Sequence, residues 1–358
     1  MPTVAKSIGT DGRDYSTITA WEADLSNAAV YNSGDTAQGV CFADSIFSEN
    51  VTISDAGSLA TYIELTSASS QRHDGTAGSA VVLKPSSAGS YAIVVEENNT
   101  DITFIEINGN SSNRLGIYHN VSLSGGSVRN CLIHNFGLTS PTSNVTYITR
   151  NWSTVNYMNN FIFNNTSPAN SDLIVHRTDS VESNFYNNTY YYNIQGLGTS
   201  GGSGAVGKIF TADASADSSF KNNIFSRIGT QVFNDLAGTS ATIAYNGVES
   251  GLGSPATNET VEAAYADHFI GTSTTDPDLH LKTGTDFIDT GVDLGTTPTG
   301  VNVDIDGRDR DEAASTWDLG ADEFGLNPPA SVTSSDNPSR RLNLAFFGIQ
   351  GLGSFSTV

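Results

Sequence analysis

The sequence predicts an all-β protein: a right-handed parallel β-helix (a solenoid) with an N-terminal capping helix and an extended C-terminal arm. Three observations lead to this fold. No charge block or long linker interrupts the first 325 of the 358 residues, and a solenoid lets one body of that length grow along a single axis. Short apolar strands alternate with Gly, Ser and Asn turns. An Asn-containing turn also recurs at intervals typical of solenoid coils.

Residues 1–35 are expected to form the N-terminal cap. Apolar residues at spacings of three and four predict a helix over residues 17–30, and Ser16 or Thr17 can serve as its N-cap. Beyond this helix the apolar period changes to two, which marks the start of the strands. A helix placed before the first strand would cover the apolar end of the first coil.

The β-helix body is predicted over residues 36–260. Asn suits the corners of such a body, because it tolerates the left-handed backbone conformation and because amides on successive coils can stack into a ladder. We therefore expect the recurring asparagines to be mainly architectural and to lie above one another. Their predicted alignment, with steps of 22, 30, 28 and 35 residues, is Asn108, Asn130, Asn160, Asn188 and Asn223. An antiparallel sandwich is the alternative fold, although hairpin signals are sparse.

The charge balance limits the classes of molecule that are expected to bind the protein. Sixteen basic and 38 acidic residues give a formal net charge of -22, which would repel a phosphate backbone, so nucleic acid is not an expected partner. The charge serves either solubility or the binding of cationic ligands or divalent metals. No stretch has the roughly 18 apolar residues of a membrane span, and the N-terminus lacks an apolar export segment. Cys41 and Cys131 lie in apolar runs and are predicted to be buried free thiols.

Residues 261–325 are predicted to close the body. This region reads Asp276-Pro277-Asp278-Leu279-His280-Leu281, then Asp304-Ile305-Asp306-Gly307-Arg308, then Asp318-Leu319-Gly320-Ala321-Asp322-Glu323-Phe324. The ordered series resembles the closing segment of bacterial and phage proteins of the right-handed parallel β-helix, pectate-lyase-like superfamily. That superfamily includes pectate lyases, phage tailspike hydrolases, adhesins and non-enzymatic virion parts, so the resemblance implies the fold and leaves the chemistry open.

One short acidic loop in this region could hold a structural Ca²⁺ ion, and no other cofactor is expected. Its aspartates offer hard oxygen ligands at near-alternating positions. The alternative is a turn in which these carboxylates accept backbone N–H groups and pair with Arg308 or Arg310. The four candidate ligands are Asp304, Asp306, Asp309 and Asp311.

No catalytic residue is assigned from the sequence. Glycan hydrolysis requires two carboxylates across a groove, but sequence spacing pairs none of Glu96, Glu97, Glu106, Asp172, Asp179 and Glu182. Arginines that could act as the base of an elimination are scattered at Arg114, Arg129, Arg150 and Arg177. Histidines in predicted strands, expected to be outward-facing or hydrogen-bonded, are His119, His134 and His176.

An aromatic patch is the best candidate for a glycan or protein contact. Alternate residues of a strand point to opposite faces, so core packing accounts for half of the patch, and exposed rings can stack on sugars or another protein. The patch consists of Tyr186, Tyr190, Tyr191 and Tyr192.

Residues 326–358 read as a linker followed by an apolar docking arm. The linker is rich in Pro, Ser and Thr. The arm would either fold back on its own β-helix or add to a neighbouring subunit. Its candidate docking residues are Arg340, Arg341, Leu342, Leu344, Phe346, Phe347 and Ile349.

The resemblance, the absence of a catalytic motif and the docking arm lead to a functional hypothesis. The chain is expected to be a non-enzymatic structural protein of a phage virion, either a capsid decoration or a spike or fibre component. It would offer a rigid surface for adhesion or reinforcement. Its partners would be other virion proteins, further copies of itself or a host-surface glycan. The alternatives are a glycan-active tailspike or polysaccharide depolymerase that uses surface carboxylates, and an exported bacterial adhesin.

Overall fold

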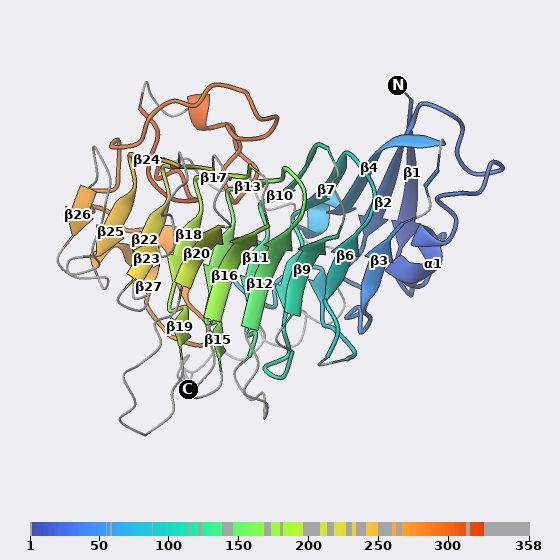
Figure 1. The fold of residues 1–358 in the computed structure, drawn as a ribbon, viewed down its shortest axis with the longest axis horizontal. Helices are drawn as coiled ribbons and strands as arrows, with labels where there is room; N and C mark the ends of the chain where they lie inside the picture. Colours follow the sequence, from blue (N-terminus) through green and yellow to red (C-terminus); the bar gives the residue numbers. More distant parts are fainter. Residues whose placement is uncertain are drawn as a thin grey trace, which may run out of the picture.

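Three sheets of parallel strands wind around one shared interior (Figure 1). This architecture comes from a computed structural model. It describes residues 2–325 except 55, 58, 88, 114, 121–123, 138–145, 168–172, 180–181, 196–207, 213–217, 227–230, 234–240, 250–259, 263–266 and 313–315. The predicted docking arm and its linker, residues 326–358, lie outside the described residues.

Each coil contributes at most one strand to each sheet. Sheet A contains β1 (Thr3–Ile8), β2 (Asp35–Cys41), β4 (Ala60–Ser67), β7 (Thr100–Thr103), β10 (Gly126–Arg129), β13 (Asn156–Met158), β17 (Asn184–Tyr186), β21 (Ser219–Lys221) and β24 (Thr242–Ala244). Sheet B contains β5 (Val82–Leu83), β8 (Glu106–Asn108), β11 (Leu132–His134), β14 (Phe161–Phe163), β18 (Thr189–Tyr191), β22 (Ile224–Ser226), β25 (Gly247–Glu249) and β26 (Thr260–Glu262). Sheet C contains β3 (Val51–Ile53), β6 (Ile93–Val95), β9 (Leu115–His119), β12 (Thr146–Asn151), β16 (Leu173–Thr178), β20 (Lys208–Ala212) and β23 (Gln231–Phe233).

The pairing between coils is parallel and in register. One column of sheet A runs from Ser127 through Asn156, Asn184 and Ser219 to Thr242. The predicted parallel β-helix is therefore confirmed, and the antiparallel sandwich is excluded for the described body. The hand of the winding stays a prediction, based on the general preference of parallel crossovers for the right-handed sense.

Matching side chains stack inside the body. The rings of Tyr157, Phe185 and Phe220 lie face to face on successive coils of sheet A, with centroids 5.4 and 4.6 Å apart and interplanar angles of 7°. Sheet B contributes a second stack, Tyr190 on Phe225 at 4.9 Å. All five side chains are fully buried. Register between coils therefore decides the packing of the core, because each ring rests on the ring of the coil below.

Two columns of residues turn the chain from sheet A into sheet B. The first column has positive φ and includes Asn130, Asn159, Asn187 and Asn222, with φ between 53° and 56°. At the next position along the chain, a buried amide ladder has Nδ2 to Oδ1 distances of 2.9, 3.0 and 3.0 Å and runs along Asn160, Asn188, Asn223 and Asn246.

The predicted ladder was correct for three asparagines and misplaced for two. Asn160, Asn188 and Asn223 are vertical neighbours. Asn130 aligns with Asn159, one position earlier, and Cys131 takes the ladder position of that coil, where its N–H donates to Asn160 Oδ1 at 3.0 Å. Asn108 ends β8 of sheet B and lies outside this corner. A one-residue offset escaped the sequence alignment because both corner positions favour Asn.

The N-terminal helix is shorter than predicted. The helix α1 spans Ile18–Glu22, and Thr17 is its N-cap, accepting a hydrogen bond from Ala20 N at 3.0 Å. After Glu22 the chain continues in tighter turns, in which Asp24 N–H donates to Trp21 O at 3.1 Å and Leu25 N–H donates to Glu22 O at 2.9 Å. Trp21 packs so closely on Gly39 of β2 that a Cβ there would lie 2.8 Å from the indole.

Residues 267–325, called the return segment below, pack along the flank of the body (Figure 1). They contain the antiparallel hairpin of β27 (Phe269–Gly271) and β28 (Asp278–Leu281). Their apolar residues cover the outward face of sheet B and form a second core with its side chains. Members from the return segment include Phe269, Leu279, Leu281 and Phe287, and members from sheet B include Leu132, Phe161 and Ile224.

The asparagines with positive φ attach this segment to the body. The Nδ2 groups of Asn222, Asn187 and Asn159 donate to the carbonyls of Val292, Val301 and Gly300 at 2.7, 2.8 and 2.9 Å. Asn130 donates to the carbonyl of Asp304. The segment that was predicted to close the body thus runs along successive coils. The predicted boundaries at residues 35, 260 and 325 stay predictions.

Two smaller predictions concern the thiols and the membrane. Cys41 and Cys131 are free and fully buried, as predicted. Among the described residues, no helix has the length and apolar character that crossing a membrane requires.

Replacing a ladder asparagine tests the fold. We expect Asn188→Ala to lower the free energy of unfolding by roughly 3–5 kcal/mol, because buried polar groups on both neighbouring coils lose their partners. The Asn188 amide bonds Tyr157 O at 2.8 Å and Asn223 Oδ1 at 3.0 Å, and its oxygen accepts from Asn160. Urea titration followed by circular dichroism measures the change.

The control is Asn156→Ala on the outward face of sheet A. Asn156 is half-buried and accepts a bond from Asn184 Nδ2 at 2.9 Å. A loss under about 1 kcal/mol is expected there. Equal losses for the two variants would contradict a special role for the ladder.

Candidate functional site

The acidic loop is a turn held by its own aspartates. Asp304 is fully buried, and its Oδ1 accepts the N–H groups of Asp306 and Arg308 at 3.1 and 2.8 Å. Burial raises the pKa of Asp304 to about 7. Asp309 accepts from Asn302 Nδ2 and from the backbone N–H of Asp311, both at 3.1 Å. These contacts are those expected of a turn.

The four predicted calcium ligands do not converge. Asp311 accepts the indole N–H of Trp317 at 3.1 Å. Asp306 instead bonds Arg308 Nη2 at 2.6 Å and His280 Nε2 at 3.3 Å. The predicted cluster of Asp304, Asp306, Asp309 and Asp311 is therefore not brought together as one set of ligands within the described residues, and a calcium ion in this loop stays an untested expectation.

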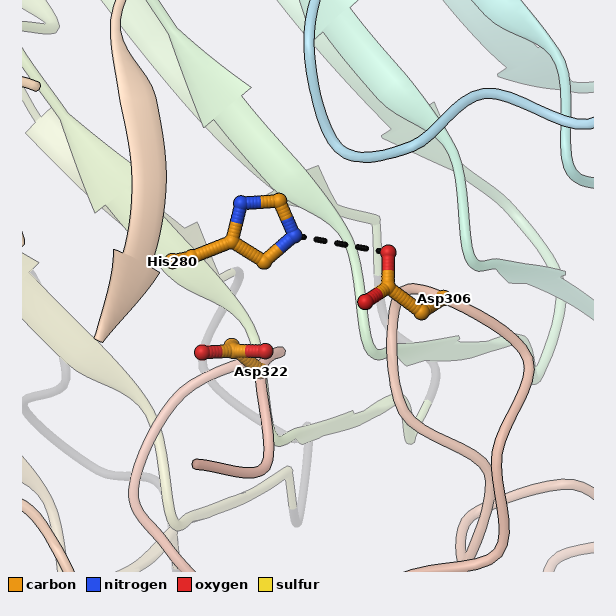
Figure 2. A group of neighbouring side chains, drawn as sticks. All are labelled: His280, Asp306 and Asp322. Atoms are coloured by element: carbon orange, nitrogen blue, oxygen red, sulfur yellow. Dashed lines mark hydrogen bonds and ion pairs between the residues drawn. The ribbon is translucent and has the colours of Figure 1, made fainter. Parts of the chain in front are cut away.

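A different set of possible metal ligands lies close together beside the acidic loop, as Figure 2 shows. His280 of β28, Asp306 of the acidic loop and Asp322 offer ligand atoms that all lie within 4.8 Å of one another. His280 Nδ1 also lies 2.6 Å from Asp278 Oδ1. Asp322 is buried, and one of its oxygens accepts the N–H of Leu281 at 2.7 Å.

The electrostatics of this group favour an ion-pair cluster over a metal site. Burial of the His280 ring opposes its charge, but hydrogen bonds to Asp278 and Asp306 and the charge of Asp322 raise its pKa to about 11. Both ring nitrogens then carry protons at neutral pH and donate to carboxylates. A metal ion would have to displace these protons. The contact of His280 with Asp306 joins the β27–β28 hairpin to the acidic loop and is called the His280 latch below.

A buried arginine organises the end of the return segment. The Arg310 side chain has no exposed surface, and its guanidinium donates to Glu323 Oε2 at 2.9 Å and to Gly320 O at 2.8 Å. It also lies 5.8 Å from the centre of the Trp317 ring. The arginine of the acidic loop therefore fixes the later Asp318–Phe324 stretch. The sequence resemblance placed these motifs in order but did not indicate that they interlock.

The predicted tyrosine patch does not form a common surface. Tyr190 points into the core and Tyr191 lies under the return segment, where its hydroxyl donates to Thr272 O at 2.8 Å; both are fully buried. Neither can therefore stack on a glycan, which corrects that part of the prediction. Tyr186 and Tyr192 are half-buried and pack against residues of the return segment clusters. The sequence could not foresee that sheet B is covered on its outward face as well.

The predicted acids have separate partners. Asp179 is buried and bonds Arg150 Nε at 2.9 Å and Arg177 Nε at 2.8 Å on the outward face of sheet C. Glu96 accepts from Asn120 Nδ2 at 2.6 Å. Glu97 accepts the N–H of Ala56, and Arg129 pairs with both Glu64 and Asp101. Glu182 is exposed. Asp172 and Arg114 lie outside the described residues.

Two of the predicted histidines are interior hydrogen-bonding residues. Burial lowers the pKa of His119 to about 4 and that of His176 to about 3, so both are neutral. His176 contacts Thr149 Oγ1 at 2.7 Å and Tyr190 Oη at 2.8 Å. His119 contacts Asn151 at 3.2 Å. They agree with the expectation of hydrogen-bonded histidines.

The third histidine, His134, lines a surface cavity of about 460 Å³. Its Nε2 lies 3.0 Å from Glu106 Oε1, and both side chains are buried. Phe163 stacks on the imidazole with centroids 4.6 Å apart. Burial alone would raise the pKa of Glu106, but the hydrogen bond from His134 and other donors lower it, so Glu106 is an anion. The remaining ring nitrogen, Nδ1, is buried and has no partner within the part of the chain that the structure describes.

This cavity lies at sheet B, beside the β27–β28 hairpin. Its floor comes from β5, β8 and β11, and one wall is the turn of the β27–β28 hairpin. Its apolar lining residues include Ala43, Ala77, Ala80 and Val82. The polar residues that line it include Asp44, Lys84, Glu106, Asn108, His134 and Asp276.

Comparison with known proteins adds little to this geometry. No family model and no curated protein matches the sequence. Among solved structures, the chain is similar to the pectin methylesterase from Aspergillus niger, with 14% sequence identity and a TM-score of 0.42 over 74% of this chain and 92% of that one. A likeness this weak carries no argument about activity. The fold assignment rests on the parallel sheets themselves.

The His280 latch predicts a dependence on alkaline pH. A pKa raised from 6.5 to about 11 means that the latch contributes its full stability below pH 6.5 and loses it as the pH rises toward 11. We expect His280→Gln to lower the thermal midpoint at pH 7 and to flatten its decline between pH 7 and 11. Differential scanning calorimetry across that range measures both effects.

Lys282→Gln serves as the control, because Lys282 is an exposed cation two residues further along. The thermal midpoint of Lys282→Gln should equal that of the unmodified protein at every pH. If the thermal midpoint of His280→Gln fell with pH as steeply as that of the unmodified protein, His280 would not be the group whose titration destabilises the fold.

Proposed function

We propose that the protein is a non-enzymatic structural component of a phage virion, either a capsid decoration or a spike or fibre part. Its body would provide a rigid rod for reinforcement, with a surface for adhesion to host glycans. Residues 326–358 would dock it on other virion proteins or on further copies of the chain. The resemblance of the acidic motifs to phage β-helix proteins is the source of the virion assignment.

The observation that carries the mechanical part of this proposal is the double attachment of the middle coils. Strand pairing in three sheets joins them, and an amide ladder links the four coils that carry Asn160, Asn188, Asn223 and Asn246. The return segment then runs across several coils and is bonded to them by outward asparagines. A rod braced along its side resists bending and local opening better than stacked coils alone.

The helix at the N-terminal end of the body also suits a structural rod. Trp21 and Ile18 of α1 are buried against the first strands, and Glu49 Oε1 and Oε2 accept the N–H groups of Ile18 and Thr19 at 2.9 Å. We interpret α1 as a cap that covers the apolar end of the first coil. Such a cap prevents end-to-end association of rods.

Removal of the arm tests the docking role. We expect deletion of residues 327–358 to leave the body folded, with an unchanged circular dichroism spectrum, because the core and return segment lie within residues 2–325. Incorporation of the truncated protein into particles should fall to background, as measured by immunoblotting of purified virions. Normal incorporation would contradict the docking role, and absence of the full chain from particles would contradict the virion role.

A glycan-active enzyme is the second candidate, and one observation favours it. Three carboxylates, those of Asp44, Glu106 and Asp276, line the same cavity, and glycoside hydrolysis uses two. Asp44 is bound to Arg13 at 3.1 Å and Glu106 to His134, so two of the three are already engaged. Release of oligosaccharides from host polysaccharide by the purified protein, abolished in Glu106→Gln, would establish this candidate over the first.

A further inference from the structure

The outward face of sheet C carries aromatic rings around two arginines. Arg150 of β12 is paired in register with Tyr118 of β9 and with Arg177 of β16, so these residues lie on successive coils. The three strands lie on the near side of the body in Figure 1, whereas the return segment packs on sheet B. The Arg150 guanidinium lies 5.5, 5.9 and 5.8 Å from the ring centres of Tyr118, Tyr147 and Trp152. These five side chains are called the ring–arginine face below.

One buried carboxylate holds both arginines in place. Asp179 Oδ2 accepts from Arg150 Nε at 2.9 Å, its Oδ1 accepts from Arg177 Nε at 2.8 Å, and its side chain is 1% exposed. Within the described residues, no other carboxylate forms an ion pair with either guanidinium. Two cations and one anion therefore leave a positive charge on this face of a chain whose formal net charge is -22. Guanidinium groups fixed in this way lose little freedom when an anion binds them.

The ring–arginine face is accessible from solvent. The side chains of Arg150 and Arg177 are 27% and 31% exposed, and Trp152 is 40% exposed. Beyond the shared carboxylate, Arg177 Nη1 donates to the Tyr147 hydroxyl at 3.3 Å and Arg150 bonds the Tyr91 side chain. A guanidinium has more N–H groups than these contacts use, so both arginines keep donors that a ligand can reach.

The extent and composition of this face fit a sugar unit that carries a carboxylate. Aromatic rings stack on the apolar face of a sugar, and guanidinium groups bind carboxylates through paired hydrogen bonds. At physiological salt the Debye length is about 8 Å, so the charge at the face outweighs acidic residues on other sides of the body. A stable protein partner would need about 20–30 residues on each side, which is far more than this face offers.

We propose that the ring–arginine face binds an acidic sugar unit of a glycan, with the sugar carboxylate on Arg150 and Arg177 and the apolar face of the sugar on Trp152. This inference rests on the adhesive part of the proposed function and names its site and ligand class. Neighbouring coils are about 4.8 Å apart, and both arginines already share the Asp179 carboxylate. The two guanidiniums are therefore close enough to bind a second carboxylate together.

Saturation-transfer NMR titrations with the purified full-length chain test this proposal. The methyl glycosides of glucuronic acid and of N-acetylneuraminic acid are compared with the methyl glycoside of glucose and with a glutamate-rich peptide. At least one acidic glycoside should bind, and the neutral glycoside and the peptide should bind about 10-fold more weakly or not at all. Added NaCl should weaken the binding of the acidic glycoside, because salt screens its attraction to the arginines.

Two variants remove different parts of the face. Arg177→Gln removes one cation and leaves the ion pair of Arg150 with Asp179, and it should weaken binding of the acidic glycoside by about 10-fold. Trp152→Ala removes an exposed ring and should weaken binding several-fold. Because the Trp152 side chain is exposed, this second variant tests the face even if Arg177→Gln fails to fold.

The matched control for the arginine variant is Arg13→Gln. Arg13 also pairs with an aspartate, Asp44 at 3.1 Å, its side chain is 26% exposed, and it lies 3.5 Å from the ring centre of Phe42. It belongs to the N-terminal cap and not to sheet C. Arg13→Gln should therefore bind the acidic glycoside like the unmodified protein.

Three results would overturn the proposal: no acidic glycoside binds, the neutral glycoside or the peptide binds as tightly as the best acidic glycoside, or Arg177→Gln and Trp152→Ala both keep full affinity. These results would leave the virion assignment standing, because sugar binding is measured without particles. Conversely, a chain that binds acidic glycosides but is absent from virions would refute the proposed location alone.

Discussion

Coils of this protein are held in register at the corner between sheets A and B, where buried asparagine amides bond from one coil to the next. The Asn188 amide satisfies the coils above and below it, and each ladder Oδ1 also accepts a backbone N–H from the preceding coil. A slip of one residue would break these bonds and turn core side chains to the outside. Interior ring stacks such as Tyr157 on Phe185 depend on the same register.

The neighbouring asparagine column extends this constraint to the outside of the body. Positive φ at Asn159, Asn187 and Asn222 is tolerated because Asn adopts the left-handed region more easily than most residues. Their amides face the flank and bond the carbonyls of the return segment. One turn geometry thus serves both the stacking of coils and the attachment of the segment that covers sheet B. That segment in turn carries the His280 latch and the hairpin wall of the cavity.

Much of the architecture could be predicted from local patterns. Alternation of apolar residues indicated the strands, and recurring Asn turns indicated coils, because both signals lie within a few residues. Asn130 was misassigned because two adjacent corner columns favour the same residue, whereas Asn108 lies at the end of β8, outside this corner. The helix over residues 17–30 was overextended, because apolar periodicity does not distinguish a continued helix from the successive turns that follow Glu22.

The candidate sites were harder to predict, because their members come from distant parts of the chain. Asp278 and His280 alternate along β28 and could be placed on one face, but Asp306 and Asp322 join them only through folding of the return segment. Similarly, Glu106 and His134 meet because β8 and β11 are adjacent coils. The tyrosine patch failed as a surface because no local signal indicates that sheet B is covered on both faces.

Disulfide trapping of vertical neighbours tests the register most directly. Asn156 and Asn184 are paired across β13 and β17, and both face outward. Cysteines at these two positions should form a disulfide under mild oxidation, because paired strands lie about 4.8 Å apart. Cysteines at Asn156 and Tyr186 should not, because a two-residue offset places their Cα atoms about 8 Å apart. Efficient cross-linking of the offset pair, or none of the register pair, would contradict the stacked-coil structure.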